Sequence, residues 1–320
     1  SIGRLPRIEF GAGRLALLPD IAAGYGQRLL IVTGGKSFTQ SPEWETLQHA
    51  LHERDCRWDV LRVAGEPSPE EIDQAVMVWH QEQVAAVIGI GGGSVLDAAK
   101  AIAGLLKPGN SVMDHLEGVG PELPYHGPAT PFIAVPTTAG TGSEATKNAV
   151  LTRHGPDGFK KSFRDDQLMA AWAILDPGLL ASCPPDLIAA NGMDAFTQLL
   201  EAYVSTRANP LSDALALSGI EAVADGLLPW FQGGEGAAGG REKMAYAALL
   251  SGICLAQTGL GSVHGLAQPL GSLFPIAHGV VCGTLLAGAT RVNIEVLHAR
   301  EPRHPALGKY AEAGRRVLRR

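Results

Sequence analysis

The sequence predicts an α/β amino-terminal domain built on a parallel sheet, followed by an all-α carboxyl-terminal domain. Three observations lead to this fold class. Up to about residue 180, short β-rich apolar runs alternate with helical stretches. A proline-bearing segment, 174–185, then interrupts the pattern, and beyond it the strand-like runs stop. We therefore expect two domains, residues 1–180 and 181–320, with the chemistry in the cleft between them.

The amino-terminal elements follow from their hydrophobic patterns. "RLLIVTGG", "WDVLRV", "VAAVIGIGGG" and "PFIAVPTT" are typical of buried strands, and "PEEIDQAVMVWHQEQ" and "SVLDAAKAIAGLL" of the helices between them. The expected strands are 28–35, 58–63, 84–93 and 131–138, and the expected helices are 69–83 and 94–106. Strands separated by helices in this way form a parallel sheet wound by helices.

The carboxyl-terminal half is rich in alanine and leucine and predicts helices. We expect them at 186–206, 211–230, 241–258 and 280–297.

Composition excludes several classes of protein. With 320 residues, 46% of them hydrophobic, the chain is long enough for folded domains with real cores. Its net charge of −6 gives no electrostatic footprint for nucleic acid. No apolar run approaches the roughly 20 residues that span a bilayer, so we expect no membrane partner. The four cysteines lie far apart without a CxxC pair, which predicts unpaired thiols and a cytoplasmic protein.

The strongest glycine motif is "GIGGGSVLDAAK", residues 89–100. Three glycines between a strand and a helix let the backbone approach a ligand and aim free N–H groups and the helix dipole at a phosphate. The motif is neither GxGxxG nor a P-loop, because Lys100 comes seven residues after Gly93. Taken alone, it fits a tight strand-to-helix connection equally well.

A second loop, "PTTAGTGSEAT" at 136–146, favours the nucleotide interpretation. It places five hydroxyl residues and two glycines after another apolar strand, and hydroxyls are donors for phosphate and ribose oxygens. A hydroxyl-rich turn that caps a helix explains one of them but not the cluster. Lys160 and Lys161 are either cations over a pyrophosphate or solvated surface charges.

A third motif, "GMDAFTQLLEAY" at 192–203, places an acid inside a helix that is otherwise apolar. Asp194 and Gln198 are four residues apart and so share one face. His264 and His278 each precede a glycine in an apolar setting, where an unpaired imidazole is costly. Each histidine alone fits a core residue bonded to a backbone carbonyl, whereas two imidazoles and a carboxylate together suit a divalent metal such as Fe, Zn, Ni or Mn.

These motifs, in this order and spacing, with "ILDPGLL" (174–180) and "HGLAQPLG" (264–271), resemble the iron-containing (group III) alcohol dehydrogenases. The resemblance covers about residues 5 to 295. It implies a Rossmann-like dinucleotide-binding domain and a helical domain, in the fold shared with dehydroquinate synthase. It further implies NAD or NADP, a divalent metal (Fe or Zn), a small alcohol or aldehyde substrate, and a homodimer.

The resemblance also assigns residues. Asp194, His264 and His278 match three of the family's four metal ligands. The nucleotide positions that match are Gly91, Gly92, Gly93, Ser94, Asp97, Thr137, Thr138, Thr141, Ser143 and Lys160.

The chain departs from the family at two histidines. Gln198 stands where the fourth metal ligand is usually histidine, and Gln268 where a histidine lies near the nicotinamide. An amide oxygen is a weaker ligand for late transition metals, and an amide cannot relay a proton near neutral pH. Gln198 is therefore either a fourth ligand or part of a metal-free polar network with Gln268.

A further departure concerns the cofactor. Gly34 follows the first strand where many NAD-preferring relatives carry an aspartate, so NADP is admissible, with Lys36 or Arg28 as cations that would favour it.

The function we expect is hydride transfer between NAD(P) and a small alcohol or carbonyl compound. The altered polar pair suggests an anionic substrate, as in the family's maleylacetate and phosphonoacetaldehyde reductases. Two alternatives stay open: a metal-free, catalytically degenerate nucleotide-binding relative, and a lyase of the dehydroquinate synthase type.

Overall fold

The computed structural model describes residues 3–155, 158–274 and 276–318. These residues group into two compact units. The α/β unit comprises the described residues of 4–138 and 143–182, and the helical unit comprises Gly3, 139–142 and the described residues from Cys183 onward. That residues 1–180 form a dinucleotide-binding domain and residues 181–320 a metal- and substrate-binding domain stays a prediction.

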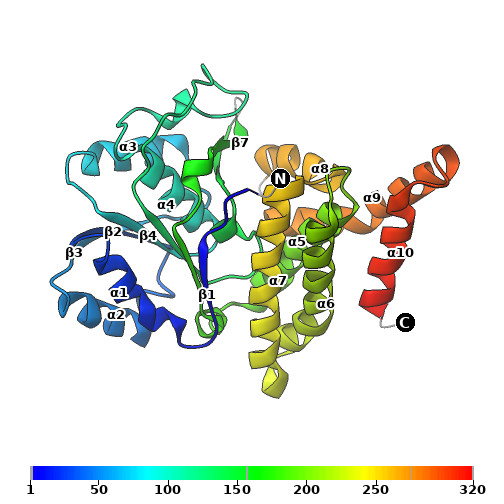
Figure 1. The fold of residues 1–320 in the computed structure, drawn as a ribbon, viewed down its shortest axis with the longest axis horizontal. Helices are drawn as coiled ribbons and strands as arrows, with labels where there is room; N and C mark the ends of the chain where they lie inside the picture. Colours follow the sequence, from blue (N-terminus) through cyan, green and yellow to red (C-terminus); the bar gives the residue numbers. More distant parts are fainter. Residues whose placement is uncertain (1–2, 156–157, 275, 319–320) are drawn as a thin grey trace. The chain divides into compact units, whose positions relative to one another are not determined.

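The α/β unit is built on a six-stranded sheet in which every pairing is parallel (Figure 1). The strand order is β1-β8-β5-β4-β2-β3. The strands are β1 (Arg7–Phe10), β2 (Arg28–Thr33), β3 (Arg57–Arg62), β4 (Ala86–Gly91), β5 (Phe132–Pro136) and β8 (Trp172–Leu175). The predicted parallel sheet and its four predicted strands are confirmed.

Helices cover both faces of this sheet, which is why its central strands are apolar throughout. On one face Leu30, Val32 and Val87 share a core with α3 and α4, and on the other Leu29 and Ile31 pack with α1 and α2. The helices are α1 (Leu18–Ala23), α2 (Pro42–His52), α3 (Pro69–Trp79) and α4 (Gly93–Leu105). The predicted helices at 69–83 and 94–106 are confirmed.

An antiparallel hairpin, which the sequence analysis missed, lies between β5 and β8 in the chain. Its strands are β6 (Asn148–Arg153) and β7 (Phe159–Arg164). Short 3-10 helices lie between these longer elements. They are η1 (Arg14–Leu17), η2 (Val112–Asp114), η3 (Ser143–Ala145), η4 (Asp166–Leu168), η5 (Pro177–Leu180) and η6 (Gly234–Gly236).

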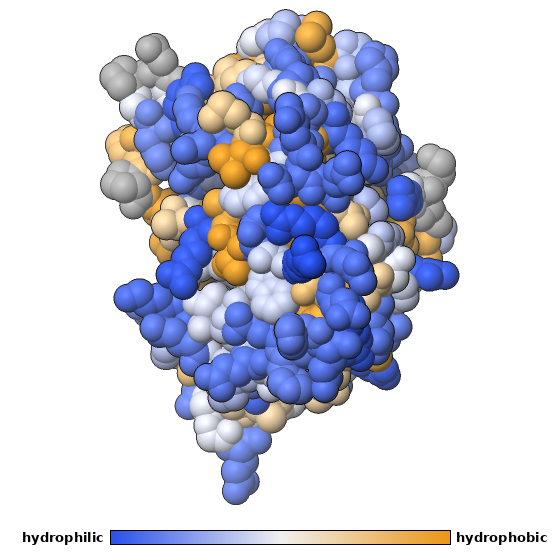
Figure 2. Space-filling view, turned by 90° about the vertical axis from the view of Figure 1, so that its left-hand side faces the viewer, coloured by the Kyte–Doolittle hydropathy of each residue, from blue (hydrophilic) through white to orange (hydrophobic). Residues whose placement is uncertain are grey.

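The side of the molecule where α2, α3 and β3 lie in Figure 1 is mainly hydrophilic (Figure 2). Its hydrophobic residues form a few separate groups. The edge strand β3 carries Arg57, Asp59 and Arg62, and charges on an edge strand oppose pairing with another chain.

The helical unit contains no strand among its described residues, as the sequence predicts. Its helices are α5 (Pro185–Val204), α6 (Pro210–Gln232), α7 (Ala237–Thr258), α8 (Ser262–Leu273), α9 (His278–Arg300) and α10 (Pro305–Leu318). Four of them confirm the predicted helices, whereas α8 and α10 were not predicted.

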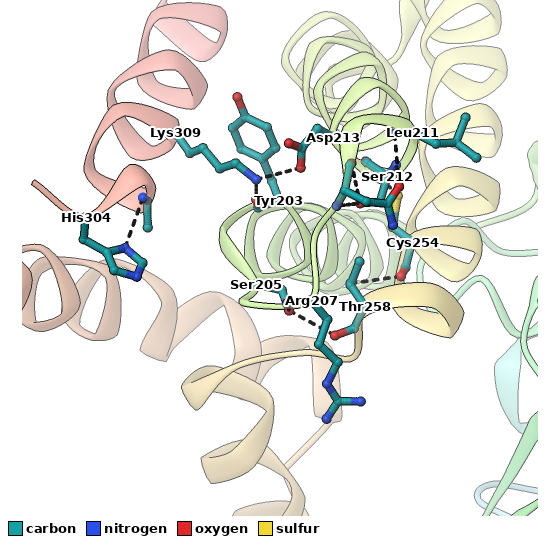
Figure 3. Close-up of polar contacts among 12 residues, drawn as sticks. Tyr203, Ser205, Arg207, Leu211, Ser212, Asp213, Cys254, Thr258, His304 and Lys309 are labelled. Carbon is teal, nitrogen blue, oxygen red and sulfur yellow. Dashed lines mark hydrogen bonds and ion pairs between the residues drawn. The ribbon is translucent and has the colours of Figure 1, made fainter. Parts of the chain in front are cut away.

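A polar network fastens α10 to the end of α5 and the start of α6 (Figure 3). Lys309 Nζ donates to the Tyr203 carbonyl oxygen at 2.8 Å and to Asp213 Oδ1 at 2.7 Å. Close by, Ser205 Oγ donates to the Thr258 carbonyl oxygen, which ties the end of α5 to the end of α7. Hydrogen bonds to charged groups are stronger than those between neutral groups, so Lys309 contributes most to the attachment of α10 to α5 and α6.

The expectation that no apolar run approaches the length of a membrane span is wrong for two helices. By length and composition alone, the 23-residue helices α6 and α9 are able to cross a bilayer, and α7 with α8 would count as a third span if that bent pair were one. The sequence analysis treated single polar residues and glycines as breaks, but these residues leave such helices apolar on average. That the protein has no membrane partner stays a prediction.

Candidate metal centre and nucleotide loop

Helix α5 presents three polar side chains on one buried face. Asp194, Gln198 and Glu201 follow one another at helical spacing and are 1%, 3% and 7% exposed. Buried polar groups require partners, since burial without a hydrogen bond or an ion is costly. The sequence analysis identified the first two and missed Glu201, although its position seven residues after Asp194 places it on the same face.

Glu201 fixes both the start of α8 and the orientation of His264. Its carboxylate accepts hydrogen bonds from the Val263 backbone N–H at 2.7 Å and from His264 Nδ1 at 2.6 Å. The other ring nitrogen, Nε2, then faces Asp194 Oδ1 at 3.3 Å. A carboxylate behind a histidine in this way fixes the tautomer and orients the ring of metal-ligating histidines.

The start of α9 brings His278 to the same place. A side chain at Gly279 would put its Cβ 2.1 Å from the Ala190 carbonyl oxygen, so only glycine lets α9 approach α5 this closely. One turn along α5 from Ala190, Asp194 Oδ1 lies 3.7 Å from His278 Nε2. The structure thus brings together Asp194, His264 and His278, as the sequence predicts.

A fourth donor, Cys282, was not predicted. Its Sγ lies 3.8 Å from His264 Nε2 and 3.6 Å from His278 Nε2. One ligand atom from each of Asp194, His264, His278 and Cys282 lies within 4.8 Å of the others. The spacing of four residues after His278, on one helix face, was the available signal.

The electrostatics of this cluster favour a cation at its centre. Burial disfavours ionisation of Asp194, but its hydrogen bond with His264 and the nearby His278 outweigh burial and lower its pKa. Burial likewise opposes the charge on His264, yet hydrogen bonds with Asp194, Cys282 and Glu201 raise its pKa to about 12. The His264 proton is thus held between two carboxylates, and a divalent ion would take the place of the proton on Nε2.

The donor set fits a divalent metal. Imidazole, carboxylate and thiolate groups are the ligands of Zn²⁺ and Fe²⁺ in proteins. Gln198 Oε1 is buried without a hydrogen-bond partner among the described residues, as an oxygen reserved for a ligand would be.

Gln268 lies on α8, four residues after His264, and is exposed. It therefore shares the His264 face of the helix. Its amide can orient a substrate oxygen but cannot relay a proton near neutral pH.

In the α/β unit, predicted nucleotide residues lie at the carboxyl ends of three neighbouring strands. Gly34 directly follows β2, Gly91 ends β4, and Thr137 and Thr138 follow β5. The Thr137 N–H donates to the Gly91 carbonyl oxygen at 2.9 Å, which joins two of these ends. Ligands of open parallel sheets bind at this edge.

The turn from β4 into α4 fits a phosphate. A Cβ at Gly91 would lie 2.6 Å from Val95, so glycine is required where the helix leaves the strand. Gly92, Gly93 and Ser94 are partly exposed between buried neighbours, and no side chain caps the helix. The first N–H groups of α4 are thus open to an anion at the positive end of the helix dipole.

Other predicted nucleotide residues are engaged with protein groups. Ser143 Oγ donates to Asp97 Oδ1 and accepts from Lys100 Nζ, which links α4 to η3. Lys160 Nζ lies 2.5 Å from Glu66 Oε1. Thr141 belongs to the helical unit.

Arg28 does not support NADP selectivity. It begins β2, at the opposite end of the strand from Gly34, and pairs with Asp59 and Glu82. Lys36 is exposed beyond Gly34 and stays a candidate.

The chain combines an α/β unit built on a parallel sheet with a helical unit that carries a candidate metal centre. Comparison with known proteins identifies its family. The family model for iron-containing alcohol dehydrogenase matches residues 6–177, and the model for the carboxyl-terminal part of the Fe-containing alcohol dehydrogenase family matches 188–317. The chain belongs to the iron-containing alcohol dehydrogenase family.

Similar proteins include curated enzymes. The chain is 38% identical over 244 residues to alcohol dehydrogenase 4 of Schizosaccharomyces pombe, covering 75% of this chain and 54% of that protein. It is 35% identical over 295 residues to a 1-propanol dehydrogenase of Salmonella typhimurium, covering 92% of this chain and 73% of that protein. The chain thus spans little more than half the length of the first of these relatives.

Solved structures show the same fold. An iron-containing alcohol dehydrogenase from Thermotoga maritima is 30% identical with a TM-score of 0.86, covering 100% of this chain and 85% of that chain. A sulfoacetaldehyde reductase from Bifidobacterium kashiwanohense in complex with NAD⁺ is 30% identical with a TM-score of 0.83, covering 92% and 76%.

Proposed function

We propose that this protein is an NAD(P)-dependent alcohol dehydrogenase that interconverts a small alcohol and its aldehyde or ketone with the help of a divalent metal. The observation that carries the proposal is the convergence of Asp194, His264 and His278 on one point of the helical unit, in a chain of the iron-containing alcohol dehydrogenase family. The open glycine turn at the start of α4 supports a dinucleotide.

Each residue has a task in this reaction. Asp194, His264 and His278 hold the metal, and Glu201 keeps the His264 ring in place from behind. The bound metal supplies a Lewis acid for the substrate oxygen, and the bound nicotinamide supplies or accepts the hydride. Gln268 orients the substrate oxygen by a hydrogen bond, and the proton is exchanged with water because an amide cannot carry it.

The nucleotide positions complete the proposal. Gly91, Gly92, Gly93 and Ser94 receive the pyrophosphate, and the absence of a carboxylate at Gly34 admits NADP as well as NAD. Asp97, Lys100 and Ser143 hold the loop in shape by bonding one another.

An anionic carbonyl compound is the proposed substrate class. A relative of known structure is a sulfoacetaldehyde reductase, whose name implies an anionic substrate for that enzyme. The two glutamines in place of family histidines support a pocket that differs from that of plain alcohol dehydrogenases.

The remaining assignments rest on sequence properties. We place the protein in the cytoplasm because its four cysteines lie far apart in the sequence without a CxxC pair. We expect a homodimer from the family resemblance, and no nucleic-acid partner, since the net charge is −6.

The test is a steady-state assay with NADH and NADPH against short aldehydes and their sulfonated or phosphonated analogues. The wild-type protein should reduce the anionic compounds with the higher kcat/KM. Asp194→Asn should lower kcat/KM by at least about 100-fold, because a Lewis acid is worth several kcal/mol in the transition state.

Two outcomes would favour the alternatives. If the protein binds NADH but turns over a carbonyl only after Gln198→His and Gln268→His are introduced together, it is a degenerate nucleotide binder. If bound NADH shows no net oxidation while another substrate is consumed, a lyase of the dehydroquinate synthase type is the better assignment. Equal reduction of plain and anionic aldehydes would refute the anionic specificity alone.

A further inference from the structure

The metal cluster contains a sulfur that the family resemblance did not anticipate. Cys282 is fully buried on α9, one turn beyond His278, and its Sγ faces the Nε2 atoms of both His264 and His278. Gln198, the residue at the position of the family's fourth ligand, is also buried nearby on α5. The chain therefore offers two candidates for the fourth ligand, an amide oxygen and a thiolate.

The distances among the donor atoms match a tetrahedral ion. Bonds of about 2.0–2.1 Å to nitrogen and oxygen and about 2.3 Å to sulfur require edges of roughly 3.3–3.6 Å between ligand atoms. The edges from Asp194 Oδ1 to the two histidines are 3.3 and 3.7 Å, and those from Cys282 Sγ are 3.8 and 3.6 Å. All four donors are within 4.8 Å of one another. Small shifts of the side chains would bring all four donor atoms to bonding distance from one ion.

Ligand chemistry favours the sulfur over the amide. A neutral amide oxygen is a hard, weak donor that suits cations such as Ca²⁺ or Mg²⁺, whereas a thiolate is a soft donor that suits zinc. With Asp194 and a Cys282 thiolate, two negative ligands also neutralise the two positive charges of the ion. That neutrality matters because the Asp194 and Cys282 side chains are both almost completely buried.

We propose that Cys282 is the fourth metal ligand of this protein, as a thiolate in an Asp194–His264–His278–Cys282 site, and that this site selects zinc over ferrous iron. The proposal rests on the proposed function and specifies its metal. On binding, the thiol releases its proton to solvent, and the thiolate and the Nε2 lone pairs of the two histidines bond the ion. Zinc accepts a fifth ligand, so four protein ligands leave a place for a substrate oxygen.

Cobalt reports thiolate ligation directly. The metal-free full chain is loaded with Co²⁺, and its near-ultraviolet absorption is recorded, since only a sulfur ligand gives an intense sulfur-to-cobalt charge-transfer band. Zinc affinity is then measured by competition with a chelator. The variants are Cys282→Ser, Gln198→Ala and, as a matched control, Cys254→Ser, which makes the same change at another fully buried helical cysteine of this unit (Figure 3).

The wild type and the Cys254→Ser control should show the band, and Cys282→Ser should lose it. Zinc affinity of Cys282→Ser should fall by more than the roughly 10–100-fold that loss of an outer-shell partner costs, while Gln198→Ala should change it only a few-fold. The wild type should also bind zinc more tightly than Fe²⁺. The ratio of the two affinities should exceed the ratio that is usual for sites made of nitrogen and oxygen ligands alone.

Cobalt bound without the band in the wild type would overturn the proposal, and this result does not depend on any variant folding. So would a band that survives Cys282→Ser, or loss of metal in Gln198→Ala alone. These results would leave the dehydrogenase assignment intact. Failure of the wild type to bind any divalent metal would instead refute both the ligand assignment and the proposed function.

Discussion

Lys100 shows how a single residue holds two segments of the α/β unit together. Its side chain is fully buried, and its Nζ donates to Ser143 Oγ and to the backbone carbonyls of Ser143 and Asn148 at 2.8–2.9 Å. Burial lowers the pKa of Lys100, and the neighbouring carboxylates of Asp97 and Glu144 oppose this shift. Because a buried charge is tolerated only when it is surrounded by partners, the segment that follows β5 is held firmly to α4.

Glu144 should make stability depend on pH. It is 3% exposed, and burial raises its pKa from an ordinary 4.5 to about 7, against its own backbone hydrogen bond and the charge of Lys100. Between these two pH values the folded state binds more protons than the unfolded state, so stability falls as pH rises and levels off above pH 7. The free energy of unfolding of Glu144→Gln, relative to that of the wild type, should therefore increase as pH rises, by on the order of 3 kcal/mol.

The measurement is the free energy of unfolding by urea for both proteins between pH 4 and 8. A difference between the two that stays constant across this range would contradict the expected titration.

The candidate metal residues were predictable to different degrees. Asp194, His264 and His278 stand out because each is a costly polar group in an apolar setting. Glu201 and Cys282 do not stand out, since an acid near a helix end is common and a lone cysteine behaves as a small apolar residue. Only the packing of α8 and α9 onto α5 reveals that both face the same point.

At the scale of elements, α5 is the support of the metal centre. It carries Asp194 and Glu201, and both elements that bring histidines are fixed to it: α8 through the Glu201 carboxylate and α9 through the close approach at Gly279. The carboxyl-terminal end of α5 is held by the network in Figure 3, and we expect the distances within the candidate centre to depend on it.

Lys309→Met should destabilise the helical unit. The substitution removes two charge-assisted hydrogen bonds, to the Tyr203 carbonyl oxygen and to Asp213. It also removes the cation–π contact of Lys309 Nζ, 4.9 Å from the centre of the Tyr203 ring. We expect a loss of about 1–3 kcal/mol in the free energy of unfolding and faster amide exchange in α10. The control is Lys243→Met, whose ion pair with Asp225 is exposed on both sides and should cost less than about 1 kcal/mol. Equal effects of the two changes would show that α10 does not depend on Lys309.

The elements that the sequence did not reveal lack a clear hydrophobic pattern, each for its own reason. β1 and β8 have only four residues each, too few for a hydrophobic period to show. In β7, "FKKSFR", the charged residues conceal the strand. Pro269 interrupts the helical pattern of α8, and in α10 only Ala306 and Ala313 are buried. The long apolar elements, by contrast, were predictable because their pattern spans many residues.

At the scale of the whole molecule, family membership and the geometry of each unit support the proposed dehydrogenase activity. The α/β unit supplies a glycine turn at the carboxyl ends of parallel strands, and the helical unit supplies a cluster of metal ligands. The departures that the family resemblance implies at Gly34, Gln198 and Gln268 stay predictions, and they concern the cofactor, metal and substrate rather than the fold.

Anomalous diffraction from a zinc-loaded crystal would show whether side chains of α5, α8 and α9 together hold a divalent metal. We expect one strong peak within about 2.0–2.3 Å of Asp194, His264 Nε2 and His278 Nε2. A map without density at that point, or with zinc bound only elsewhere on the chain, would contradict it.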